Sequence, residues 1–295
     1  KFMKIYDCTT FYSENMMMEL RFNILDKFVH KFIVVESKFS HSGKKKRLNF
    51  DINNYPKFKD KIIYLVIDHE PKDIIIDHTN SQRVKRINSL KRIELSYDYM
   101  INGISDALDD DLIILSDNDE IPNLNSSMFK STKKKIVIFK QLFFYYKLNL
   151  LYDLMPWFGS KACKKKYLKS FSWLRNLKNK KYSFWRLDTY FSKLKSNDLE
   201  IIENGGWHFT NVKSPEELFI KMKNFGHHDE FDDSGLTLAD LKEKIEKKEV
   251  FYNHFADQKN KNKWFYDYKL KKINFDKLPQ HVIENKEKYK LWLDL

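Results

Sequence analysis

The chain has 295 residues, with 54 Lys and Arg against 41 Asp and Glu, which gives a formal net charge of +13. A hydrophobic content of 42% with 16% aromatic residues excludes a disordered chain, and 7 Gly with 6 Pro exclude a collagen-like or low-complexity one. The positive charge is explained by solvated lysines, or by an anionic partner such as a sugar nucleotide, a nucleic acid or an anionic membrane face.

The two cysteines, Cys8 and Cys163, exclude a disulfide framework and a cysteine-based zinc site. No stretch has the length of a transmembrane helix, and the N-terminus lacks the apolar segment of a signal peptide. We therefore expect a cytoplasmic protein. Because the chain has no repeats and no linker-like segment, we also expect one domain over residues 1–295.

The first half of the chain alternates between strand and helix patterns. Four short, mostly β-branched apolar runs predict buried strands at residues 2–6, 32–35, 62–67 and 112–115. Apolar residues at helical spacing predict helices over residues 14–28 and about 81–104. Strands that alternate with helices predict an α/β fold with a largely parallel central sheet and right-handed crossovers.

An acidic residue lies at or just beyond the end of each predicted strand. The four are Asp7, Glu36, Asp68 and Asp117. One carboxylate at a strand end is common, whereas four in succession indicate a shared polar edge. In open α/β sheets ligands bind just outside the carboxyl ends of the strands, so we expect a site along this edge.

The densest acidic group follows the fourth strand, where Asp117, Asp119 and Glu120 precede Pro122. Two carboxylates separated by one residue can both reach a hard divalent cation, which takes oxygen ligands and commonly bridges to substrate phosphates. The alternative interpretation is a polar turn after a strand, where Asp and Asn are favoured in any case.

The second half has a different pattern. Apolar runs at residues 136–139 and 142–148 predict adjoining strands or a hairpin. Residues 157–186 mix Lys and Arg with aromatic residues, which either stack on sugars or bases or pack a small irregular subdomain. Residues 201–209 predict a strand, a pair of glycines that permits close backbone approach, and His208. Helix starts are predicted at Ser214 and Thr237.

Several short segments stand in order over roughly residues 5 to 230. They are Tyr6-Asp7-Cys8, Glu19-Leu20-Arg21, residues 32–37, residues 42–44, Gln82-Arg83, residues 115–122, Gly206-Trp207-His208-Phe209 and residues 225–230. Together these segments resemble glycosyltransferase family 17. The best-known members of this family transfer N-acetylglucosamine from a UDP-sugar to the core mannose of N-glycans.

The resemblance implies a GT-A-like, nucleotide-binding α/β sandwich and an inverting transfer to a glycan or glycoprotein acceptor. Residues 1–122 would form the nucleotide-binding half, and residues 123–295 would form a smaller aromatic and basic acceptor-side region with C-terminal helices. The acidic motif would bind Mn²⁺, or else Mg²⁺, together with the UDP-sugar. No nucleic-acid partner is expected, peripheral contact with a membrane stays open, and so does the oligomeric state.

The resemblance also suggests roles for single residues. The metal ligands would be Asp119, Asp117 directly or through water, and His208, which alternatively contacts the diphosphate. Other contacts to the donor would come from Arg83 to the diphosphate, and from Asp7 and Glu36 to the nucleoside.

Inversion also requires a carboxylate base that takes the proton of the acceptor hydroxyl. The candidates are Glu120, Asp229 and Glu230. We favour Asp229 or Glu230, because Glu120 is also placed to line the donor sugar.

Two other function classes fit the same sequence. A metal-dependent nuclease or nucleotidyltransferase also combines acidic clusters with a basic surface, although such enzymes usually hold two metals with several carboxylates. A non-catalytic glycan-binding module would use the aromatic residues around Trp173 and Trp185 and would need neither metal nor nucleotide.

Overall fold

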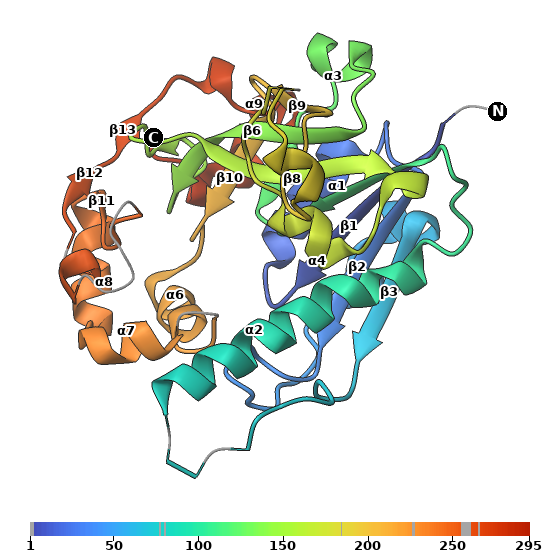
Figure 1. Ribbon diagram of the computed structural model, residues 1–295. Coiled ribbons are helices and arrows are strands. Elements are labelled where there is room, and N and C mark those ends of the chain that lie inside the picture. Colours follow the sequence, from blue (N-terminus) through green and yellow to red (C-terminus); the bar gives the residue numbers. More distant parts are fainter. Residues whose placement is uncertain are drawn as a thin grey trace.

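The computed structural model describes residues 3–76, 78–79, 81–183, 185–225, 228–254, 261–264 and 266–295, except for the side chains of residues 229, 261 and 262. Within these residues the centre of the molecule is an 11-stranded sheet with the main order β13-β7-β6-β8-β4-β1-β2-β3 (Figure 1). The parallel block comprises β1 (Ile5–Phe11), β2 (Lys31–Ser37), β3 (Ile62–Ile67) and β4 (Leu112–Ser116).

Beyond β4 the sheet becomes mixed. β8 (Trp157–Lys164) is antiparallel both to β4 and to β6 (Ile136–Tyr145). The other strands of this sheet are β5 (Glu120–Pro122), β7 (Leu150–Leu151), β9 (Leu199–Ile202), β10 (Gly206–Thr210) and β13 (Lys271–Lys272). A separate two-stranded sheet pairs β11 (Glu249–Val250) with β12 (Tyr268–Lys269). The α/β fold is confirmed, with the predicted parallel pairing in the first four strands.

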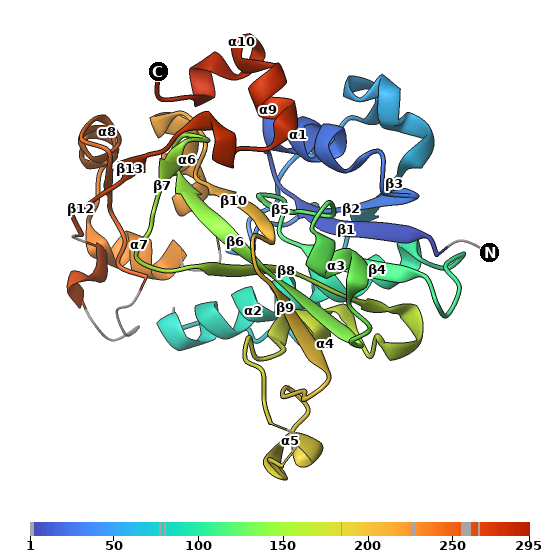
Figure 2. The ribbon, with the colours of Figure 1, turned by 90° about the horizontal axis from the view of Figure 1, so that it is seen from above.

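Helices cover both faces of the parallel block. The α-helices of the described residues, only some of which lie over this block, are α1 (Asn15–Leu25), α2 (Gln82–Asp98), α3 (Ser127–Ser131), α4 (Phe171–Asn176), α5 (Asp188–Phe191), α6 (Pro215–Met222), α7 (His228–Ser234), α8 (Leu238–Glu246), α9 (Gln280–Glu284) and α10 (Lys286–Tyr289). Figure 2 shows α1, α9 and α10 on one side of the sheet and α2 with α4 on the other.

This two-sided cover explains why the strands read as continuous apolar runs. In β2, Phe32 and Val34 belong to the core under α1, whereas Ile33 and Val35 belong to the core under α2. Successive side chains of a strand point to opposite faces, so a strand buried on both sides has no polar face to show.

Two predicted strand ends are wrong. β1 continues through Asp7 to Phe11, and β2 continues through Glu36 to Ser37, with both carboxylates buried inside the strands. A buried carboxylate normally ends a strand pattern because desolvation is costly, but here each acid has a cationic partner from another element. Four acids therefore do not line one edge of the sheet.

The prediction of two adjoining strands or a hairpin at residues 136–139 and 142–148 is also wrong. The chain forms a single strand, β6, with a register shift between Ile138 and Lys140. Two polar residues, Lys140 and Gln141, separate the apolar runs, but Lys140 pairs with Glu203 and Gln141 is buried, with its amide donating to Ser160. The bulge keeps the strand continuous across this polar step.

The helix starts at Ser214 and Thr237 are confirmed. Both residues accept a hydrogen bond from the backbone N–H three positions on, and both form a capping box, with Glu217 and Asp240 respectively. These helices, α6 and α8, pack with α7 on a third aromatic core that includes Phe143 of β6. None of the helices in the described ranges is both long enough and apolar enough to cross a membrane.

Candidate functional site

The acidic loop of residues 117–120 turns at the carboxyl end of β4, as predicted. Every residue of β4 is buried, and the Ser116 hydroxyl donates to Ser160 Oγ at 2.7 Å. A tight turn follows, because the Glu120 N–H donates to the Asp117 carbonyl at 3.1 Å while the Asp117 N–H donates to Glu120 Oε2 at 3.0 Å. The loop is therefore fixed by its own backbone before any ligand contributes.

Arg21 of α1 supports this loop from beneath. Its Nε and Nη2 donate to the two carboxylate oxygens of Asp7 at 2.7 and 2.5 Å, and its Nη1 donates to the carbonyl of Glu120 at 2.5 Å. Arg21 and Asp7 are both fully buried. The structure thus uses Asp7 to orient Arg21, and Asp7 is buried and lines neither of the cavities described below, so it does not make the nucleoside contact predicted from the sequence.

We expect Arg21→Lys to lower the free energy of unfolding by about 2 kcal/mol, because lysine keeps the charge but loses the forked donors that join Asp7 to the loop. Urea denaturation measures this change. Arg186→Lys is the matched control, since Arg186 also binds an aspartate through two nitrogens but is exposed, and exposed pairs contribute little. Equal losses for the two variants would contradict the supporting role of Arg21.

Asp119 lies between two nitrogen groups from the second half of the chain. Its Oδ1 is 3.5 Å from His208 Nε2, and its Oδ2 is 4.0 Å from Lys221 Nζ. Burial by itself would raise the pKa of Asp119, but the charges of His208 and Lys221 and the His208 hydrogen bond outweigh it and lower the pKa to about 2. Asp119 is therefore a carboxylate at every physiological pH.

His208 is held rigidly in β10. Its ring stacks between Trp157 and Phe143, with centroid distances of 4.3 and 4.7 Å. β10 reaches this position because Gly206, at φ +123°, lies against β5, where a Cβ atom would come within 2.1 Å of the Ile121 carbonyl oxygen. His208 Nδ1 is buried with no hydrogen-bond partner in the described residues. The ring thus presents its Nε2 edge to Asp119.

Glu120 is a buried carboxyl group with two donors. Trp157 Nε1 donates to its Oε1 at 2.6 Å, and the Asp117 N–H donates to its Oε2. Burial and then the charge of Asp117 raise the pKa of Glu120 to about 7. Gly159 of β8 makes room for this group, because a Cβ atom there would lie 2.9 Å from the Glu120 carboxyl carbon.

Asp117 is bound by residues that sequence reasoning missed. Tyr97 of α2 donates a short hydrogen bond to its Oδ1, and Arg175 Nη2 lies 3.6 Å from its Oδ2. The Arg175 guanidinium also stacks over the Tyr97 ring at 4.7 Å. Buried Lys161 fixes the end of α4 by donating to the carbonyls of Arg175 and Leu177 at 2.6 Å. No periodicity or spacing links these residues, because three separate elements supply them.

The loop separates two cavities. One, the β1–β2 cavity, has a volume of about 350 Å³ and lies outside the carboxyl ends of β1 and β2; its lining includes Thr10, Ser37, Lys46, Asp119 and Lys221. The other, the β8 cavity, has a volume of about 330 Å³, and its lining includes Glu120, Trp157, Gly159, Lys161 and Asn179. Tyr97, Asp117 and Arg175 line both cavities and form the wall between them.

Glu36 does not face the nucleotide-binding edge as expected. It is fully buried and accepts hydrogen bonds from the backbone N–H groups of Asn49 and Phe50 at 2.8 and 3.0 Å, from the Tyr64 hydroxyl at 2.8 Å, and from Lys46. Its contribution is indirect, because Lys46 lines the β1–β2 cavity. The loop of residues 43–47, which reads as merely basic in the sequence, thus supplies a cation to the site.

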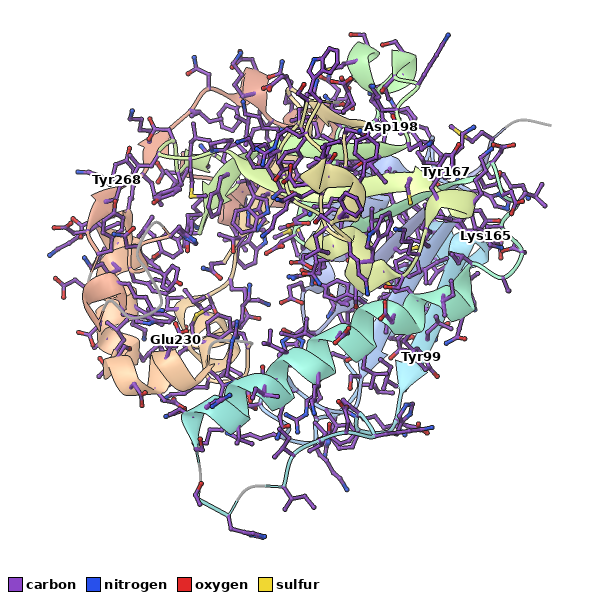
Figure 3. The ribbon with its side chains drawn as sticks, viewed as in Figure 1. Tyr99, Lys165, Tyr167, Asp198, Glu230 and Tyr268 are labelled. Carbon is purple, nitrogen blue, oxygen red and sulfur yellow. The ribbon has the colours of Figure 1, made fainter. Side chains whose placement is uncertain are left out.

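The other predicted residues lie away from the acidic loop. Arg83 is exposed on α2 and lines neither cavity. Glu230 lies on α7, among α6 to α8 in Figure 3, where it pairs with buried Lys263. Asp229 belongs to the same helix, but its side chain lies outside the described residues. Of the predicted residues, the structure therefore brings together Asp117, Asp119, Glu120 and His208.

The donor atoms here fit a divalent cation only in part. Within the described ranges, no group of three or more His, Cys, Asp or Glu side chains is placed to hold a metal ion. However, Asp119 Oδ1 and His208 Nε2 are 3.5 Å apart, near the separation of about 3 Å between neighbouring ligands of one small cation. Such cations commonly complete their shell with water and substrate phosphate, so this pair suits a metal bound together with a diphosphate.

Comparison with known proteins gives one family and several solved structures of partial similarity. The family model described as glycosyltransferase family 17 matches residues 1–160. No curated protein matches the chain. Among solved structures, HddC from Yersinia pseudotuberculosis is 10% identical, with 68% of this chain and 90% of that chain covered and a TM-score of 0.32. The inositol-1-phosphate CTP transferase from T. maritima is 13% identical, with 75% and 96% covered and a TM-score of 0.34.

Proposed function

The chain belongs to glycosyltransferase family 17, and on this basis we propose that it is a metal-dependent, inverting enzyme that uses a UDP-sugar. As a glycosyltransferase it takes a sugar from an activated donor and passes it to an acceptor. We propose N-acetylglucosamine as the sugar and a glycan hydroxyl as the acceptor, following the best-known members of the family.

One observation carries this proposal. The three carboxylates of the acidic loop are divided between two cavities, with Asp119 on the β1–β2 cavity, Glu120 on the β8 cavity and Asp117 on both. An inverting transfer needs the donor's leaving group and the acceptor on opposite sides of the reacting sugar, because the acceptor oxygen attacks the anomeric carbon from the face opposite the leaving group. We assign the donor to the β1–β2 cavity and the acceptor hydroxyl to the β8 cavity.

The β1–β2 cavity suits a nucleoside diphosphate. It lies at the ends of parallel strands, where such ligands bind, and Lys46 and Lys221 place ammonium hydrogen-bond donors in its lining. Asp119 and His208 would hold the divalent cation, which would offset the charge that grows on the departing diphosphate. Lys221, at 4.0 Å from Asp119, is placed to share that task.

Glu120 is the base that the geometry favours, in place of Asp229 or Glu230. It would take the proton of the acceptor hydroxyl as that oxygen bonds to the anomeric carbon, while the bond to the diphosphate oxygen breaks and its electron pair leaves with the diphosphate. A pKa of about 7 allows Glu120 both to be ionised at neutral pH and to hold the proton. Glu230 is instead neutralised by Lys263.

A thermal-shift screen of UDP-, GDP- and CMP-sugars, each with and without Mn²⁺, tests the proposal. We expect UDP-sugar with Mn²⁺ to raise the Tm by about 5 °C near saturation, because only the native state binds them. His208→Gln should remove most of the part of this shift that depends on Mn²⁺.

His69→Gln, on an exposed histidine that lines neither cavity, is the matched control and should keep the full shift. If UDP-sugar raises the Tm equally with and without Mn²⁺, the proposed role of a metal ion in donor binding is refuted. A chain that no nucleotide sugar stabilises, but that binds DNA or RNA with a steep salt dependence, would be a nuclease or nucleotidyltransferase instead.

A further inference from the structure

A projecting segment between α4 and β9 has features that neither the fold nor the two cavities explain. It comprises residues 178–183 and 185–196, includes the short helix α5, and stands out from the body of the molecule in Figure 2. We refer to it as the α5 extension. Its base is anchored, because the Lys178 N–H donates to the Leu194 carbonyl at 2.8 Å and Trp173 Nε1 donates to the Lys193 carbonyl at 2.8 Å.

The tip of the α5 extension exposes large apolar side chains. The exposed fractions are 76% for Trp185, 72% for Leu187, 63% for Tyr190 and 88% for Phe191. Single exposed apolar residues are ordinary on a protein surface, but four within seven residues form a patch that favours contact with another apolar phase.

The same segment is strongly basic. It carries one acid, Asp188, and six cationic residues: Lys178, Lys180, Lys181, Arg186, Lys193 and Lys195. Asp188 pairs with Arg186 and Lys195, and Lys181 pairs with Glu200 of β9. An apolar tip surrounded by positive charge is therefore presented to the solvent.

We propose that the α5 extension docks the protein on a membrane surface rich in anionic lipids. Trp, Tyr, Phe and Leu side chains would enter the boundary between headgroups and acyl chains, while the lysines would lie among the lipid phosphates. A nucleic acid would use the charges but would gain nothing from Leu187. A protein partner would need a broader surface than this narrow projection offers.

The α5 extension begins beside the β8 cavity, so docking would also position this cavity relative to the membrane. This consequence rests on the function proposed above. Arg175 and Asn179, on either side of its first residue, line the β8 cavity. A docked molecule would therefore hold its acceptor cavity beside the lipid surface, where an acceptor displayed on the membrane is within reach.

Flotation with lipid vesicles tests the docking itself. Vesicles of pure phosphatidylcholine are compared with vesicles that contain 30 mol% phosphatidylglycerol, without nucleotide or metal, so that the result is independent of the transferase proposal. We expect binding only to the anionic vesicles. Lys180→Gln with Lys193→Gln should weaken it by about 25-fold, roughly fivefold for each charge at the surface. Leu187→Ser with Phe191→Ser should weaken it about tenfold or more.

Two matched pairs control for general loss of charge or apolar surface. Lys59→Gln with Lys269→Gln removes two exposed lysines elsewhere, and Leu291→Ser with Leu295→Ser removes two similarly exposed leucines; both pairs should bind as the unchanged protein does. The proposal is overturned if the unchanged protein does not float with anionic vesicles or if the control pairs bind as weakly as the extension variants. It is equally overturned if loss of Leu187 and Phe191 has no effect, since binding would then be electrostatic alone.

Discussion

Asp119→Ala is expected to lower kcat/KM by about 10³-fold while the protein stays folded, because a preorganised charge at the developing diphosphate is typically worth that much. Asp119 combines three properties that the assignment needs: it lines the β1–β2 cavity, its Oδ1 is 3.5 Å from His208 Nε2, and its low pKa keeps it ionised. The variant should also lose the Mn²⁺-dependent part of UDP-sugar binding, measured by calorimetry.

Asp110→Ala is the control for this experiment. Asp110 also binds two cations, Lys164 and Lys166, and these likewise lower its pKa to about 2, but it is exposed and lines neither cavity. Its replacement should leave kcat/KM unchanged. Activity of Asp119→Ala within a factor of a few of the unchanged enzyme would show that the acidic loop does not bind the donor, and the proposed function would fail with it.

Glu120→Gln should lower kcat by 10²- to 10⁴-fold, the usual contribution of a positioned general base. Donor binding should persist, because Glu120 lines the β8 cavity and not the β1–β2 cavity. Glutamine has nearly the same shape, although its single carbonyl oxygen serves only one of the two donors, Trp157 Nε1 and the Asp117 N–H. Single-turnover kinetics at saturating donor separates the lost chemistry from lost binding.

The pH dependence distinguishes a base from a merely structural carboxylate. Only ionised Glu120 accepts a proton, so kcat should rise about tenfold per pH unit below pH 7 and level off above it. Asp119 does not contribute to this rise, since it is ionised down to about pH 2. Trp157→Phe removes a donor that stabilises the carboxylate and should move the midpoint upward. An unchanged midpoint in that variant would assign the titration to another group.

The raised pKa of Glu120 also affects stability. Between pH 4.5, its ordinary value, and about 7, the folded protein keeps a proton that the unfolded chain releases. The free energy of unfolding should therefore fall as the pH rises through this window, with the full cost of the buried charge present above pH 7. Glu120→Gln should flatten this part of the stability profile. Burial of the Glu120 carboxylate thus lowers the stability of the fold but gives this group a pKa that suits a general base, as is common in active sites.

Several features of this protein follow from the sequence by local rules. Continuous β-branched runs specify strands buried on both faces, as at residues 32–35, and the Ser214 and Thr237 capping boxes specify where α6 and α8 begin. The position of Asp117 to Glu120 at the end of β4 is equally local, because a buried strand followed by clustered acids and Pro122 has few other arrangements. Each of these features depends on residues that lie close together in the chain.

Only the tertiary structure decided which charged residues form the site. Asp7 and Glu36 have the sequence pattern of strand-end ligands, yet Arg21 and Lys46 neutralise them inside the sheet. Tyr97 and Arg175 carry no sequence signal but form the wall between the cavities. The physical reason is that desolvation is compensated by whichever charge lies near in space, and that partner can come from any element. A carboxylate's neighbours in the chain therefore do not determine whether it supports the fold or faces a substrate.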